Sequence, residues 1–144
     1  MRSYLAFLWS AASLVPLCAA DMDSVAKEKE KLQGTWAAVS VVDNGRSEST
    51  ELLKTLKLTI KGDKYIFRDG DWKLSAAYKI DPTKKPKQMS ITFEEGPKKG
   101  KTMLAIYSVE GDKLKICGGD RRPTEFASKR KSEVILFEFK REKP

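Results

Sequence analysis

The chain has 144 residues, with 28 basic and 20 acidic side chains and a formal charge of +8. Histidine is absent, which excludes Ser-His-Asp and Cys-His catalytic systems and histidine-based zinc sites. Because no other catalytic constellation, metal-ligand spacing or phosphate-binding loop is recognisable, we expect a protein that is not an enzyme and that needs no metal or cofactor.

The first twenty residues have the layout of a secretory signal peptide. Arg2 precedes an apolar stretch over residues 4–17, and the small residues Cys18 and Ala20 come before Asp21. This stretch is too short for an ordinary membrane span. We therefore expect removal of residues 1–20 and export across the inner membrane, to the periplasm or the extracellular space. The alternative, lipid attachment at Cys18, is disfavoured because the residue before Cys18 is not small.

Removal of residues 1–20 takes away one arginine and no acid, which lowers the formal charge to +7. It also leaves Cys117 as the only cysteine, so an intrachain disulfide is excluded and the domain must depend on a packed core. Residues 21–31 are charged helix formers, typical of a short helix or a solvated leader. We expect residues 32–144 to form one domain that has no membrane span and is a monomer.

From Gly34 onward the chain consists of short apolar or alternating runs separated by turn signals. The clearest run is 72–80, in which Trp72, Leu74, Ala76 and Tyr78 share one face and Lys73, Ser75, Ala77 and Lys79 the other. The predicted strands are 34–42, 56–60, 65–67, 72–80, 89–93, 103–109, 114–117 and 134–139.

Eight consecutive strands without a crossover helix favour an all-β antiparallel meander. Such a meander has exposed edges unless it closes, and eight strands suit an up-and-down barrel. We therefore predict an eight-stranded barrel with a short N-terminal helix; the alternative is an antiparallel β-sandwich. In a barrel the three longest connections, 43–55, 94–102 and 118–133, fall on one rim.

The two ends of the predicted barrel carry a known pattern. Gly34-Thr35-Trp36 opens the first strand and Arg141 follows the last, which resembles the G-x-W and terminal arginine of lipocalins. This resemblance implies that Gly34, Trp36 and Arg141 form a structural clamp in which the cation covers the indole ring.

A second resemblance covers residues 32–141. The segments 32–36, 58–65, 79–82, 96–102, 111–117 and 122–126 are similar in sequence and order to an uncharacterised secreted, lipocalin-like domain family of planctomycete bacteria. The resemblance implies a barrel fold and export. It carries no activity and no catalytic or ligand-binding residue.

Function is predicted from shape and charge. The loop-rich rim collects cations that favour an anionic group; this basic rim consists of Lys98, Lys99, Lys101, Arg121, Arg122, Lys129, Arg130 and Lys131. The predicted interior contributors to a ligand site are Trp72, Tyr78, Met89, Ile91, Tyr107, Phe137 and Phe139.

Two functions remain open from these residues. The first is an exported, non-catalytic binding protein that holds a small apolar or anionic amphiphilic ligand in the barrel. The alternative is a filled barrel that binds an anionic envelope polymer or a protein through its basic rim, as an inhibitor does. Nucleic acid is disfavoured, because the aromatic residues alternate inward and are not interleaved with the cations.

Overall fold

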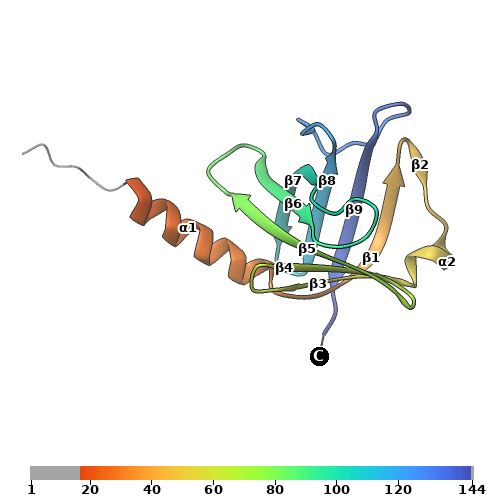
Figure 1. Ribbon diagram of the computed structural model, residues 1–144, viewed down its shortest axis with the longest axis horizontal. Coiled ribbons are helices and arrows are strands. Elements are labelled where there is room, and N and C mark those ends of the chain that lie inside the picture. The colour runs from red at the N-terminus through yellow and green to blue at the C-terminus, as the bar shows by residue number, and fades with distance from the viewer. Residues whose placement is uncertain (1–16, 144) are drawn as a thin grey trace, which may run out of the picture.

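The chain folds into a closed antiparallel β-barrel with a helix before its first long strand (Figure 1). The computed structural model describes residues 17–143, with side chains from residue 22 onward, so most of the predicted signal peptide lies outside the described residues. The elements are α1 (Leu17–Leu32), β1 (Gly34–Asp43), β2 (Arg46–Ser47), α2 (Thr50–Leu53), β3 (Leu56–Lys61), β4 (Lys64–Asp69), β5 (Trp72–Asp81), β6 (Lys87–Phe93), β7 (Thr102–Glu110), β8 (Lys113–Gly119) and β9 (Val134–Arg141).

The barrel closes because β1 pairs on both sides. It pairs with β3 through Gly34–Ala37 and with β9 from Trp36 to Asp43, while β3 to β9 each pair with their neighbours in sequence. The predicted eight-stranded barrel is therefore confirmed. The sandwich alternative is wrong, since the first and last long strands are joined. The β1–β9 register shifts between Ala38 and Ser40, which leaves Val39 in a bulge with 53% of its surface exposed.

The connection from β1 to β3 holds two small elements. Asn44 and Gly45 have φ angles of 51° and 83°, which the tight turn into β2 requires. A Cβ on Gly45 would lie 2.6 Å from the backbone nitrogen of Arg130, so this turn packs closely against the β8–β9 loop. The helical turn α2 begins at the N-cap Ser49, whose side chain accepts a hydrogen bond from the Leu52 amide.

The long connections gather at one end of the barrel, as predicted. The registers place the ends of β1, β6 and β8 beside the starts of β9 and β7, because Asp43 pairs with Ile135 and Leu104 pairs with Gly119. We call this end, formed by residues 43–55, 70–71, 94–101 and 120–133, the mouth. The other end carries the tight turns after β3 and β7 and the β5–β6 connection.

Helix α1 meets the barrel at the end opposite the mouth, which we call the closed end. In Figure 1 it leads away from the barrel on the side opposite α2. Its last residue, Leu32, is fully buried in the core, and the Trp36 indole donates a hydrogen bond of 2.9 Å to the Leu32 carbonyl. No helix in residues 17–143 combines the length and the apolar character of a membrane crossing.

Candidate ligand-binding site at the barrel mouth

Most of the predicted interior residues are core residues. Six of them are buried, none with more than 8% of its surface exposed, and Met89 and Ile91 have no exposed surface. Side chains without accessible surface touch other protein atoms on every side, so no ligand can lie against Met89 or Ile91. These six residues therefore lie in the interior, as predicted, but their burial does not support a ligand cavity at their level. The six are Tyr78, Met89, Ile91, Tyr107, Phe137 and Phe139.

Trp72 is the seventh predicted interior residue, and it alone of the seven is not in the interior. It shares the inward row of β5 with Ala76 and Tyr78, but 53% of its surface is exposed. The reason is its place in the fold, since Trp72 is the first residue of β5 and directly follows the turn at the mouth. The alternating pattern placed Trp72 on the inward face of β5 correctly. Whether an inward side chain is buried depends on its position along the strand, and Trp72 lies at the open end of the barrel.

A pocket of about 500 Å³ opens at the mouth, above the filled core. Its apolar floor is formed by Phe93, Met103 and Ile135, which lie on the inward rows of β6, β7 and β9 and are only partly buried. The other lining residues are polar or small: Asp43, Asn44, Lys98, Lys101, Thr102, Gly118, Gly119, Asp120 and Glu133.

The inward rows of four strands continue into charged residues at this height. Asp43 follows Val41 in the alternation of β1, and Asp120 follows Gly118 beyond β8. Lys101 precedes Met103 by two positions, and Glu133 precedes Ile135 by two. Asp43 lies within β1, where side chains two residues apart share a face. The other three residues lie just outside their strands, and all four line the pocket, so the walls above the core carry charge at the mouth.

The predicted basic rim is only partly brought together. Lys98 and Lys101 line the pocket, and Lys99 is exposed on the same loop without lining it. Lys129 pairs with Glu125 at 3.1 Å. Among the other predicted rim cations, Arg121, Arg130 and Lys131 are exposed.

Arg122 does not belong to the rim. Its guanidinium donates hydrogen bonds to the carbonyl oxygens of Met89 and Ala105 and to the Ser90 hydroxyl, on the outer wall of β6 and β7. The β8–β9 loop is thereby held over the outside of the barrel, where the Cys117 sulfur lies 3.7 Å from the carbonyl oxygens of Glu125 and Ala127. The expectation of Arg122 as a rim cation is wrong, because backbone acceptors occupy it.

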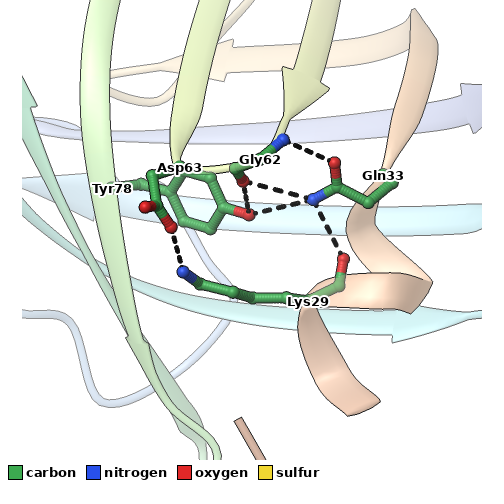
Figure 2. Close-up of polar contacts among 5 residues, drawn as sticks. All are labelled: Lys29, Gln33, Gly62, Asp63 and Tyr78. Atoms are coloured by element: carbon green, nitrogen blue, oxygen red, sulfur yellow. Dashed lines mark hydrogen bonds and ion pairs between the residues drawn. The ribbon is translucent and has the colours of Figure 1, made fainter. Parts of the chain in front are cut away.

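A polar network seals the closed end (Figure 2). Gln33 accepts a hydrogen bond of 2.7 Å from the Gly62 amide and donates to the Lys29 carbonyl and the Tyr78 hydroxyl. Tyr78 donates to the Gly62 carbonyl at 2.8 Å, and Lys29 pairs with Asp63. Burial raises the pKa of Tyr78, which keeps its hydroxyl protonated as a donor. This network joins α1 to the β3–β4 turn and is structural.

Glu28 makes a second polar contact between α1 and the closed end of the barrel. Only 5% of its surface is exposed, and its carboxylate accepts hydrogen bonds from Lys87 at 2.7 Å and from the Tyr107 hydroxyl at 3.3 Å. Lys31 lies 3.5 Å away. Burial acts to raise the pKa of Glu28, but Lys87 and Lys31 outweigh it and hold the pKa below its usual value.

Searches among models of known protein families, among curated proteins and among solved structures found no match to this chain. The site is therefore interpreted from its own geometry. Among residues 17–143, no group of three or more carboxylate or thiol side chains is arranged to hold a metal ion.

Proposed function

We propose that this protein binds a small amphiphilic molecule at the mouth of its barrel. The observation that carries the proposal is the pocket itself, which combines an apolar floor of Phe93, Met103 and Ile135 with a charged rim. Its volume of about 500 Å³ lies within the range of small-molecule sites, roughly 300–1,000 Å³. A floor that excludes water and a rim that holds charge suit a molecule with an apolar part and a polar head.

The filled core limits how the ligand binds. Ile91, one inward position below Phe93, has no exposed surface. The apolar part of the ligand therefore lies on the floor and does not pass toward the closed end. We accordingly propose a shallow site with the head group at the rim, in place of a deep cavity.

We also propose that the protein works after export, in the periplasm or the extracellular space. Residues 1–20 support this proposal through Arg2, the apolar stretch that follows it and the small residues before Asp21. The absence of a second cysteine after residue 20 is compatible with either compartment.

Titration with a nonionic, environment-sensitive fluorescent amphiphile tests the site. We expect saturable one-to-one binding that Met103→Trp weakens at least about tenfold, because the larger side chain fills the floor. The matched control is Val39→Trp, which places the same indole on the exposed bulge of the outer wall. Equal affinity of the Met103→Trp variant and wild type would place the ligand outside the mouth and overturn the proposal.

The filled core also favours a second candidate, an interaction module that binds an anionic polymer or protein through exposed rim cations. Retention on a sulfated polysaccharide matrix tests it. We expect loss of retention at raised salt and in a variant carrying Lys98→Glu, Lys99→Glu and Arg121→Glu. Arg122 is left unchanged because it anchors the loop. Unchanged retention in the triple variant would exclude this candidate.

A further inference from the structure

The charges that line the mouth pocket are segregated. Both cations, Lys98 and Lys101, belong to the loop between β6 and β7. The three carboxylates come from the next strands around the barrel, with Asp43 at the end of β1, Asp120 directly after β8 and Glu133 directly before β9. Since β8, β9 and β1 are consecutive neighbours in the barrel, one wall of the pocket is cationic and the adjoining wall is anionic.

These five groups have no ionic partner in the described part of the chain. Within residues 22–143 none of them lies within 4.0 Å of an opposite charge, and no side-chain hydrogen bond to any of the three carboxylates is present. Nearby charges do pair, as Lys64 does with Glu94 at 2.8 Å. All five side chains are exposed and line one pocket without pairing with each other, so each is available to a ligand group of opposite charge.

We propose that the ligand of the mouth is a zwitterionic amphiphile, an inference that rests on the proposed function. Its anionic group lies toward Lys98 and Lys101, its ammonium group lies toward the three carboxylates, and its apolar part covers the floor. A zwitterionic head group replaces the purely anionic head group that the sequence led us to expect, because the pocket lining holds more carboxylates than lysines. An anion alone would be drawn to one wall and repelled by the other.

The chemistry of the anionic wall identifies the kind of ammonium. Quaternary ammonium groups are recognised by aromatic faces, and the residues of this wall include none. The three carboxylates supply acceptors for N–H donors. The Asn44 side-chain oxygen already accepts a hydrogen bond of 3.2 Å from the Glu133 amide. A primary ammonium, which has three such donors, fits this wall better than a trimethylammonium. The head group is therefore of the phosphoethanolamine type, with one anionic and one primary ammonium group.

Isothermal titration with three single-chain lipids tests the inference. All carry one dodecanoyl chain and are kept below their critical micelle concentrations; their head groups are phosphoethanolamine, phosphocholine and phosphoglycerol. We expect the phosphoethanolamine lipid to bind roughly tenfold more tightly than the other two, as one charge-assisted hydrogen bond predicts. Equal affinities for all three, or tighter binding of the phosphoglycerol or phosphocholine lipid, would overturn the inference.

Variants of the two pocket walls test the anionic and the ammonium group of the ligand separately. Asp43→Asn with Asp120→Asn is expected to remove the preference for phosphoethanolamine and to strengthen binding of the phosphoglycerol lipid. Lys98→Gln with Lys101→Gln is expected to weaken both lipids. The controls are Lys99→Gln, on the same loop but outside the pocket, and Asp71→Asn, in the exposed β4–β5 turn; neither is expected to change either affinity.

The outcomes distinguish this inference from the proposed function. If the nonionic amphiphile binds the mouth and Met103→Trp weakens it, but the three lipids bind equally, only the zwitterionic head group is refuted. If neither the nonionic amphiphile nor any lipid binds, the proposed function itself is refuted.

Discussion

Arg141 lies directly over Trp36, with its guanidinium carbon 4.2 Å from the centre of the indole ring. The two residues face each other across the β1–β9 ladder that closes the barrel. Arg141 also donates hydrogen bonds to the carbonyls of Lys31, at 2.6 Å, and of Gln33, at the end of α1. A Cβ on Gly34 would lie 2.9 Å from this guanidinium, so the glycine lets the arginine approach. Through Arg141, the last strand thus both caps the C-terminal end of α1 and covers the Trp36 ring.

Replacement of Trp36 is expected to destabilise the barrel severely. Trp36 is fully buried, and Trp36→Ala should lower the free energy of unfolding by about 3–5 kcal/mol, since it leaves a large cavity and removes the cation–π contact. Urea denaturation of protein that lacks residues 1–20 measures this. Trp72→Ala is the matched control and should cost less than about 1 kcal/mol, because Trp72 is exposed. Similar midpoints for the two variants would contradict a structural role for the clamp.

The buried carboxylate of Glu28 predicts a pH-dependent stability. Its pKa in the folded state is lower than in the unfolded state, because Lys87 and Lys31 stabilise the charged form against the effect of burial. A lowered pKa stabilises the fold above the unfolded value, and this contribution disappears as the pH falls through the folded pKa. Glu28→Gln should therefore be less stable than wild type at pH 7, with the difference shrinking below about pH 4.5.

Thermal midpoints measured from pH 7 down to pH 3 test this expectation. Glu30→Gln is the control, because Glu30 lies on the same helix but is exposed, and its profile should run parallel to that of the wild type. A constant difference between the Glu28→Gln variant and wild type over the whole range would show that the ion pair with Lys87 does not contribute.

The hydrogen bonds from Arg122 to β6 and β7 should keep the β8–β9 loop closed over Cys117 and so limit the reactivity of its thiol. The thiol is fully buried beneath the β8–β9 loop, and burial raises its pKa, so the native protein should react slowly with a thiol reagent. Arg122→Ala removes three hydrogen bonds and should raise the reaction rate roughly tenfold or more by easing local opening.

The experiment uses protein that carries Cys18→Ser or lacks residues 1–20, so that only Cys117 reacts. Arg121→Ala is the matched control, since Arg121 is exposed and neighbours Arg122 in sequence. Equal rates for the two variants would mean that Arg122 does not hold the loop closed.

The barrel was predictable from local patterns. Alternation in β5 and the turn signals that separate the strands indicated all eight long strands. Closure was expected because a meander of eight strands otherwise has exposed edges, and because Gly34, Trp36 and Arg141 resemble the lipocalin pattern. The docking of α1 was not predictable, because Glu28 and Leu32 sit in a charged segment whose partners, such as Lys87, lie far away in sequence. Nothing local distinguishes a buried glutamate from its solvated neighbours.

The candidate site was predictable only in part. The sequence placed Lys98 and Lys101 on the basic rim but indicated Asp43 and Glu133 only as members of long connections. For Asp43 a signal was present, because it follows Val41 by two positions on the inward row of β1. Glu133 lies just before β9 with a φ angle of 55°, where strand alternation gives no guidance. Which inward residue of a strand is the first to lie above the filled core depends on the register and stagger of the strands. Composition does not reveal either of them.

Gly118, at the wall of the mouth pocket, should tolerate no side chain. A Cβ there would lie 2.8 Å from the Ala105 Cβ and 3.0 Å from the Leu104 carbonyl oxygen on the neighbouring strand. Gly118→Ala should therefore cost about 1–3 kcal/mol in free energy of unfolding, through overpacking against β7. Adding Ala105→Gly removes the closer of the two contacts and should recover part of this loss.

A double-mutant cycle measured by urea denaturation gives the coupling between Gly118→Ala and Ala105→Gly. We expect the double variant to lose about 1 kcal/mol less free energy of unfolding than the sum of the losses in the two single variants, because the two Cβ atoms compete for one space. The cycle with Ala76→Gly is the control: Ala76 is equally buried, on β5, but is not among the nearest neighbours of a Cβ at Gly118, so its effect should be additive. Additivity in both cycles would show that the close approach of β8 to β7 does not limit the size of residue 118.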